Sequence, residues 1–388
     1  MFLNTSHRSI KAELDDYFYK KSPTSFRRQL LTKGAFSKAR RKFKATAFID
    51  LLHKTVDYFY TQVPQSQRNN WYGFRTLAVD GSDLTLPNET DLIQIFGTQN
   101  NNSDVVVPMA KLSLLYDVHS KLPLDAQLDR KHSSERDLAV RHLERTQDND
   151  LLLYDRGYYA YWLVLQHILL SRDFCFRLKN NACTQVKDFI KSGKKQVIIT
   201  LNSSDDMQQK ALDRGLEIVN FKVRLIRIKT PKGVYVLMTS LTNQKKYATK
   251  HFYELYHLRW NIEEAYKVQK AFLNVEDFSG RTAHSIRQDV HASILIQALV
   301  AIECFASQPY IPKKVQQRQH PYQINFMMAI RSLKRRLIDV LSTTLDAFDI
   351  YRWLTAIARN LTIIKPDRSF ERTKVRCRRQ KLRTGYKT

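Results

Sequence analysis

Between residues 74 and 179 the chain alternates strand-like and helical patterns, and their order limits the possible fold more than any other feature. Three strand patterns come first, over 74–82, 110–118 and 122–129, and the first of them ends at an Asp-Gly turn, Asp80-Gly81. They are followed by a helical pattern over 134–145, an apolar strand that ends at Asp155, a helical pattern over 158–171 and a strand over 174–179. The expected order is β-β-β-α-β-α-β, which predicts an α/β fold.

This order is typical of a ribonuclease H-like α/β domain. After it come β-branched runs separated by Lys- and Gly-containing turns, which indicate a strand-rich insertion, and then helical periodicity returns. We therefore divide the chain into an N-terminal helical region (1–70), the first part of the core (71–171), a β-rich insertion (172–250), a helix that completes the core (251–285), a C-terminal helical region (286–364) and a basic tail (365–388).

The charge balance favours a polyanionic partner. Lys and Arg number 64 against 37 Asp and Glu, a formal net charge of +27. A field of this sign attracts nucleic acid, and the tail from Lys365 is rich enough in basic residues to contribute. We expect DNA to be the partner.

Part of this charge lies in residues 24–46, where the spacing resembles a helix-turn-helix. Thr24 or Ser25 is placed to cap a first helix, Gly34 to form the turn, and Ser37 to cap a second helix. Basic residues, Arg40 and Arg41 among them, would face phosphates. A basic, solvated helix pair without DNA contacts has the same spacing, so both interpretations stay open.

Other features argue against several classes of protein. The 10 glycines form neither a dinucleotide-binding nor a P-loop pattern, so no nucleotide cofactor is expected, and the four cysteines form no C-x-x-C pair. The N-terminus lacks a signal-peptide pattern, and the longest apolar stretch, 293–306, carries Gln297 and Glu303. We expect a cytoplasmic protein without a membrane segment.

Two aspartates follow apolar strand patterns. Asp80 follows Leu-Ala-Val, and Asp155 follows Leu-Leu-Leu-Tyr. Both side chains can project from the carboxyl end of one sheet, where carboxylates serve as hard ligands for Mg²⁺. A strand-terminal aspartate is also a common turn former, and Asp83 nearby is expected to be only a cap or surface group. The pair needs a third partner.

A helical pattern after the insertion supplies one. Tyr256, Arg259, Glu263 and Lys270 fall within roughly a 60° arc at about 100° per residue. A carboxylate flanked by these donors would place a metal ligand beside groups that hold phosphate. A salt-bridged, solvent-exposed helix face explains the same spacing, and periodicity does not decide between the two.

The spacing Tyr-x₂-Arg-x₃-Glu-x₆-Lys resembles the signature of DDE transposases of the insertion sequence 4 type. Three other segments, in the same order, also resemble blocks of that family: Asp-Gly-Ser at Asp80, Leu-Ser-Leu-Leu-Tyr-Asp-Val at 112–118 and Tyr-Asp-Arg-Gly-Tyr at 154–158. The resemblance covers roughly residues 25–300. It implies a ribonuclease H-like catalytic core with a β-strand insertion, flanked by helical regions.

The resemblance also implies the residues and the chemistry of the site. Asp80, Asp155 and Glu263 would bind two Mg²⁺ or Mn²⁺ ions for in-line attack on a phosphodiester. The phosphates near the scissile bond would be held by Tyr256, Arg259 and Lys270, with Trp260 packed beside them. The activity would be cut-and-paste DNA transposition: binding of double-stranded terminal inverted repeats, cleavage, and strand transfer into target DNA, by a homodimer in the bacterial cytoplasm at the nucleoid.

Some relatives stack a flipped base on an aromatic residue of the strand insertion. Tyr235 is the best-placed aromatic for that role here, although the insertion has no Trp and Tyr235 can equally be a core strand residue. Two other functions stay open. One is a non-catalytic repressor or inactive transposase derivative that occupies the same DNA ends, and the other is a nuclease of the same fold that cuts without joining.

Overall fold

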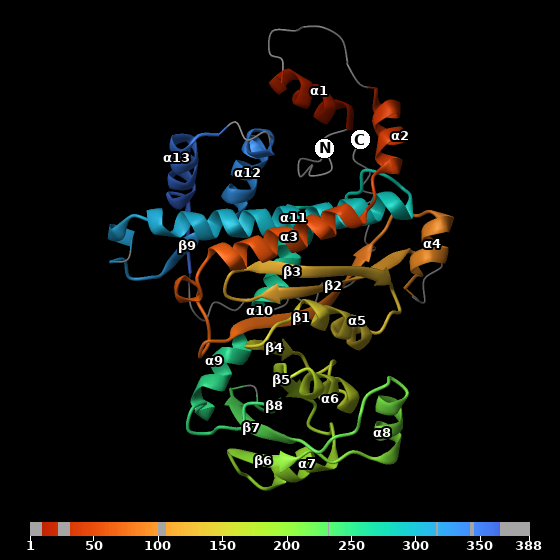
Figure 1. The fold of residues 1–388 in the computed structure, drawn as a ribbon, viewed down its shortest axis with the longest axis vertical. Coiled ribbons are helices and arrows are strands. Elements are labelled where there is room, and N and C mark those ends of the chain that lie inside the picture. The colour runs from red at the N-terminus through yellow and green to blue at the C-terminus, as the bar shows by residue number, and fades with distance from the viewer. Residues whose placement is uncertain are drawn as a thin grey trace. The chain divides into compact units, whose positions relative to one another are not determined.

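A computed structural model describes residues 10–21, 32–99, 106–231, 233–315, 317–341 and 345–364 (Figure 1). The predicted first helix of the helix-turn-helix and the basic tail lie outside these residues. The chain forms two compact units. Unit 1 contains residues 1–62, 84–110 and 267–388, and unit 2 contains residues 63–83 and 111–266.

Unit 2 contains most of an eight-stranded sheet with the order β3-β2-β1-β4-β5-β8-β7-β6. Its first five strands are β1 (Arg75–Thr85), β2 (Met109–Asp117), β3 (Leu122–Arg130), β4 (Asp150–Tyr154) and β5 (Asp173–Leu178). Between them lie α5 (Glu135–His142), η2 (Leu143–Arg145) and α6 (Tyr161–Leu169). β4 is buried along its whole length, as its apolar sequence predicts. The predicted β-β-β-α-β-α-β order is confirmed, except that the short helix α4 (Thr90–Phe96) also lies between β1 and β2.

The insertion extends this same sheet. β6 (Gln196–Thr200), β7 (Lys222–Thr230) and β8 (Gly233–Thr239) pair antiparallel with one another, and β8 pairs antiparallel with β5. Two helices accompany them, α7 (Thr184–Lys191) and α8 (Asp205–Leu212). The predicted strand-rich segment is therefore present, and backbone hydrogen bonds to β5 make it continuous with the core sheet.

The prediction of an Asp-Gly turn after Asp80 is wrong. β1 continues through Gly81 to Thr85, although its parallel pairing with β4 ends at Ala78. Gly81 has no positive φ angle, and its amide donates to the Asp80 carboxylate at 3.0 Å. The backbone therefore stays extended where the Asp-Gly pair suggested a turn.

Unit 1 is mostly helical. Its N-terminal helices are α1 (Ile10–Lys21), α2 (Lys33–Lys42) and α3 (Thr46–Gln62). The 3₁₀ turn η1 (Gln65–Gln67), which follows them in the chain, belongs to unit 2. The later elements of unit 1 are the π-helical turn η4 (Val268–Phe272), α11 (Ala283–Ser307), η5 (Gln308–Tyr310), η6 (Lys313–Val315), β9 (Tyr322–Ile324), α12 (Phe326–Leu341), α13 (Ala347–Ala358) and β10 (Leu361–Ile363). The N- and C-terminal helical regions thus share one unit.

The long helix α11 organises unit 1. α3 lies along it, and α12 and α13 pack against it (Figure 1). The apolar cluster where α11, α12 and α13 meet includes Ile296, Val300, Ile330 and Ile357. By length and composition the segment 283–310 is apolar enough to cross a membrane, but 61% of its apolar window is buried inside the protein, as in a core helix.

The start of α2 differs from the prediction. Thr32 caps this helix by accepting a hydrogen bond from the Ala35 amide at 3.1 Å, and the helix continues through Gly34 and Ser37. Gly34 therefore forms no turn, and Ser37 is not an N-cap. The Thr32 hydroxyl satisfies an N-terminal amide before either residue is reached.

Glu303 of α11 is a buried carboxyl group with 5% exposure. Burial raises its pKa from 4.5 to about 8, and the neighbouring polar groups of Trp353 and Ser332 offset only part of that effect. The folded state therefore binds a proton that the unfolded chain releases, so stability falls as pH rises from about 5 through about 8.

We expect Glu303→Gln to remove most of this pH dependence. The variant should lose less melting temperature than the wild type between about pH 5 and about pH 9, because the amide stays neutral throughout. Thermal unfolding followed by circular dichroism measures the difference. Glu254→Gln, an exposed change in the short helix α9 (Phe252–His257), is the matched control. Equal pH dependence in wild type and Glu303→Gln would contradict the assignment.

Candidate active site

Two neighbouring parallel strands bring Asp80 and Asp155 to the same edge of the sheet. In the parallel pairing of β1 and β4, Ala78 lies opposite Leu153, and each aspartate follows two residues later. In α/β proteins, ligands bind at the carboxyl ends of parallel strands. The strand pairing thus accounts for the proximity that the two sequence patterns predicted.

The helical segment that carries Glu263 is not one continuous α-helix. It consists of η3 (Thr249–His251), α9 (Phe252–His257) and α10 (Trp260–Lys267), joined by a tight turn. Arg259 lies in that turn, where its amide donates to the carbonyl three residues earlier, on Tyr256, at 3.2 Å. The turn brings Arg259 between Tyr256 and Glu263.

The Arg259 guanidinium bridges two of the predicted carboxylates. Its Nη2 donates to Glu263 Oε1 at 2.7 Å, and its Nη1 lies 3.6 Å from Asp80 Oδ2. Arg259 is only 8% exposed, so little water screens these contacts. Strand β1 and helix α10 are therefore joined through one buried cation.

Tyr256 links the second aspartate to the same group. Its hydroxyl donates to Asp155 Oδ1 at 3.2 Å, and the Arg259 guanidinium lies 5.9 Å from its ring centroid. Burial raises the pKa of Tyr256 above its ordinary value, which keeps the hydroxyl protonated as a donor. The structure thus brings together Asp80, Asp155, Tyr256, Arg259 and Glu263.

The electrostatics of Asp80 are unusual for a carboxylate. Burial raises its pKa from 3.8 to about 6, Arg259 and the Gly81 amide lower it, and the charges of Glu263 and Glu135 raise it. Asp80 is therefore a buried carboxyl group that also feels the charges of two further carboxylates. A bound cation would offset this repulsion.

Three carboxylates are a donor set that suits a hard divalent cation. In the part of the chain that the structure describes, however, no three His, Cys, Asp or Glu side chains are grouped closely enough to hold a metal ion. The Arg259 guanidinium contacts both Asp80 and Glu263, so it already occupies the place of a cation beside these two carboxylates. The donor chemistry fits a metal, and these contacts would have to rearrange around it.

Tyr235 extends the site onto the insertion. Its ring centroid lies 5.9 Å from that of Tyr256, and the Arg177 guanidinium lies 4.8 Å from its ring. The side chain is half-buried, and burial raises its pKa to about 12. The structure thus places Tyr235 beside the predicted phosphate-holding residues.

Two more residues were predicted for this site, Trp260 and Lys270. Trp260 is exposed, and its indole donates to Glu264 at 3.3 Å. Lys270 lies in the π-helical turn η4 of unit 1. A π-helical turn does not keep the periodicity of an α-helix, so the predicted stripe does not extend regularly to Lys270. A phosphate contact by Lys270 stays a prediction.

Arg40 and Arg41, predicted to bind DNA, have opposite environments in unit 1. Arg41 is exposed. Arg40 is 8% exposed and forms an ion pair with Asp289 at 2.8 Å. Its guanidinium is thus engaged inside the protein, and we reassign Arg40 from a DNA contact to a structural residue.

The sequence analysis missed two residues that attach α10 to the sheet. The Tyr266 hydroxyl lies 2.6 Å from the carbonyl oxygen of Asp80 and 3.1 Å from that of Leu112. The Asn261 amide donates to the Val118 carbonyl at 2.9 Å. Tyr266 follows Glu263 by three residues, a spacing that places both on the same helix face and could have identified it.

Glu135, at the start of α5, is a further carboxylate near Asp80. A Cβ atom on Gly81 would lie 3.1 Å from Glu135 Oε1, so only glycine leaves this carboxylate undisturbed. Lys111 holds Glu135 at 2.8 Å and also lies 3.4 Å from Asp83. No sequence motif marked Glu135, because its proximity to Asp80 depends on how α5 packs.

Asp83, which the sequence suggested was only a cap or surface group, is held by two lysines. Lys131 contacts it at 2.6 Å and Lys111 at 3.4 Å. Both contacts lower the pKa of Asp83, whereas burial opposes them. Asp83 is therefore neutralised by ion pairs and differs from Asp80 in its environment.

We expect Arg259→Gln to raise the pKa of Asp80 further above about 6, because the variant removes the main cation that lowers it. The pKa can be measured by carbon NMR on protein labelled at the aspartate carboxyl carbons, with Asp80→Asn used to assign the signal. Arg281→Gln, which breaks an exposed ion pair with Glu89 in unit 1, should leave it unchanged. A pKa that stays constant or falls in Arg259→Gln would contradict the bridge.

Comparison with known proteins identifies the family. The family model described as "Transposase DDE domain" matches residues 71–299. The chain is 25% identical over 241 residues to transposase InsG for insertion sequence element IS4 of Escherichia coli K12, covering 62% of this chain and 53% of that protein. It is also 25% identical over 144 residues to putative transposase InsZ of the same strain, covering 35% of this chain and 46% of InsZ.

These matches span about half the length of the relatives. A cryo-EM structure of a piggyBac transposase synaptic complex with hairpin DNA aligns with 96% of this chain and 76% of that chain, at 10% identity. Its TM-score of 0.43 is too low to support an inference. The family model covers more than half of the chain and includes every residue of the candidate site, and the chain belongs to the DDE transposases of the IS4 type.

Proposed function

We propose that this protein is a DNA transposase that binds terminal inverted repeats and catalyses metal-dependent cleavage and strand transfer. The observation that carries the proposal is the convergence of Asp80, Asp155 and Glu263, through Arg259 and Tyr256, within the family's domain. Mere DNA binding would not need three carboxylates at one site. The strand order β3-β2-β1-β4-β5 supports a ribonuclease H-like core.

Asp80, Asp155 and Glu263 would hold two divalent cations, Mg²⁺ or Mn²⁺. When bound, such ions lower the pKa of an attacking water or 3′-hydroxyl and stabilise the leaving oxygen. The charges of Glu263 and Glu135 near the buried Asp80 support this assignment, because a cation bound there would offset the repulsion between these carboxylates.

Tyr256 and Arg259 would orient the reacting phosphate. The Arg259 fork matches a phosphate bidentately, and its contacts with Asp80 and Glu263 already place it beside the carboxylates. Tyr235, adjacent to Tyr256, would offer a face for an unpaired base. Lys270 would add a point charge, and exposed Trp260 would pack near the DNA.

The partner would be double-stranded DNA, both the terminal repeats and the target, bound by a homodimer that pairs two ends. The +27 net charge supports a polyanionic partner. Such a protein would act in the bacterial cytoplasm at the nucleoid. Neither the family nor the site geometry favours the non-catalytic alternative.

We expect Asp80→Asn, Asp155→Asn and Glu263→Gln each to reduce cleavage by about a hundredfold or more. A metal contributes several kcal/mol of transition-state stabilisation, and each amide removes a charged ligand while keeping side-chain shape. Single-turnover cleavage of a pre-bound transposon-end duplex in Mg²⁺ measures the loss, and a gel-shift titration measures binding. Asp83→Asn is the matched control and should cleave normally. Near-normal cleavage by a triad variant would refute the role of that residue.

Tyr266→Phe should reduce cleavage on the order of tenfold without weakening DNA binding. The variant keeps the buried ring but removes the hydroxyl that ties α10 to β1, and small misplacement of a catalytic group is costly. Thr239→Val is the control, because it removes a buried hydroxyl that bonds the Phe174 carbonyl in the same sheet. If both variants lose activity equally, the effect reflects stability and not the placement of Glu263.

A further inference from the structure

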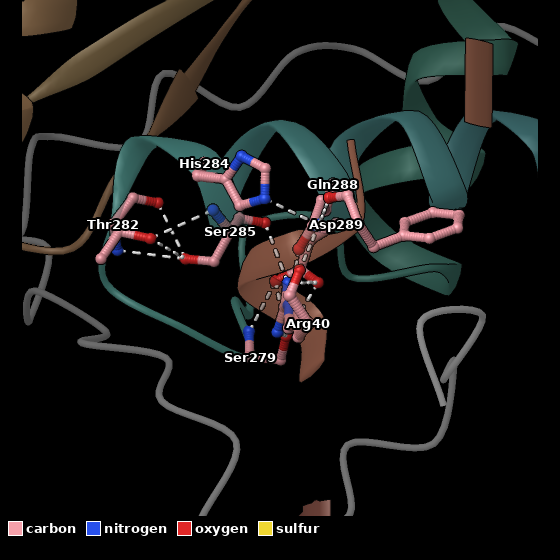
Figure 2. Close-up of polar contacts among 8 residues, drawn as sticks. Arg40, Ser279, Thr282, His284, Ser285, Gln288 and Asp289 are labelled. Atoms are coloured by element: carbon pink, nitrogen blue, oxygen red, sulfur yellow. Dashed lines mark hydrogen bonds and ion pairs between the residues drawn. The ribbon is translucent and has the colours of Figure 1, made fainter. Parts of the chain in front are cut away.

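Arg40 is the one buried residue of the basic helix α2 and lies near its C-terminal end. Its Nε donates to Gln288 Oε1 at 2.7 Å, and its Nη2 contacts Asp289 Oδ1 at 2.8 Å. It also donates to the Ser279 hydroxyl and, at 3.1 Å, to the Ser285 carbonyl (Figure 2). A buried ion pair is costly unless its donors are satisfied, and these contacts satisfy the guanidinium.

Gln288 completes the attachment in the opposite direction. Its side-chain amide donates to the Arg40 carbonyl at 3.1 Å and to the Phe43 carbonyl at 2.5 Å. The last carbonyls of a helix lack intrahelical partners, so α11 caps the C-terminal end of α2. Ser279 is itself held in place, because its amide donates to Asp289 at 2.7 Å. We call this set of contacts the Arg40 clamp.

The clamp fixes how α2 is rotated about its axis. At about 100° per residue, Arg41, Lys38 and Lys42 lie at roughly 100°, 160° and 200° from Arg40. All three side chains are exposed. Burying Arg40 against α11 therefore turns a face of three cations away from α11.

We propose that the Arg40 clamp positions Lys38, Arg41 and Lys42 to contact the phosphate backbone of double-stranded DNA. Three cations on one face of one helix suit a regular row of phosphates, and their contacts would be independent of base sequence. Arg40 and Asp289 are then positioning residues that touch no DNA. The inference rests on the proposed function. It adds that one face of α2 contacts DNA and that the Arg40 clamp orients this face.

The test measures binding of the full chain to a fluorescein-labelled duplex of mixed sequence by anisotropy over a range of salt concentrations. Combined Lys38→Gln, Arg41→Gln and Lys42→Gln should reduce the slope of log K against log salt by about two to three, at about 0.9 per phosphate contact. An unchanged slope overturns the proposed surface. If the wild type shows no salt-dependent binding to the duplex, the proposed function is refuted instead.

Asp289→Asn separates positioning from charge. It makes the protein more positive, so charge alone predicts equal or tighter binding, whereas loss of the clamp predicts binding that is several-fold weaker. Asp50→Asn, an exposed change in α3, makes the same charge difference without touching the clamp and should bind at least as tightly as the wild type. Equal behaviour of the two variants overturns the positioning role.

A double-mutant comparison excludes general destabilisation. Added to the triple variant, Asp289→Asn should cause little further loss, because the cations that it positions are already gone. A full additional loss would overturn the coupling. If Asp289→Asn fails to fold by circular dichroism, Ser279→Ala, which removes one partner of Arg40, replaces it in the same comparison.

Discussion

The candidate site depends on one buried cation, Arg259. Without it, Asp80 and Glu263 would be like charges close together in a poorly solvated place, which is unfavourable. The guanidinium contacts both, and its planar fork lets it serve two carboxylates at once. Arg259 lies in a tight turn between two short helices. The conformation of this turn therefore determines whether the guanidinium reaches both carboxylates.

The sheet and the helix make different contributions to this arrangement. Parallel pairing of β1 and β4 fixes Asp80 relative to Asp155 through backbone hydrogen bonds, independently of their side chains. Glu263 comes from a helix that has no backbone pairing to the sheet, so side chains must locate it. Tyr266 and Asn261 do so by bonding carbonyl groups of β1 and of the residue that follows β2. The placement of the third carboxylate is therefore more sensitive to single substitutions than that of the other two.

Buried polar groups also define unit 1. Arg40 is satisfied by Asp289, Gln288 and serine groups, which makes it an anchor between α2 and α11. Glu303, farther along α11, forms no ion pair with any residue that the structure describes, and burial raises its pKa. The helix α11 thus carries Asp289, which is paired with a buried cation, and Glu303, which takes up a proton instead.

The sequence by itself determined the order of strands and helices, the apolar strand segments that lead into Asp80 and Asp155, and the spacing of Tyr256, Arg259 and Glu263. These features are local, because periodicity and apolar runs depend on neighbours along the chain. Tertiary structure decided the rest. Arg40 and Arg41 are adjacent and chemically alike, yet packing against α11 buries one and exposes the other. Likewise, β1 continues past Gly81, and Glu135 approaches Asp80, through contacts between segments that lie far apart in sequence, and no local pattern records such contacts.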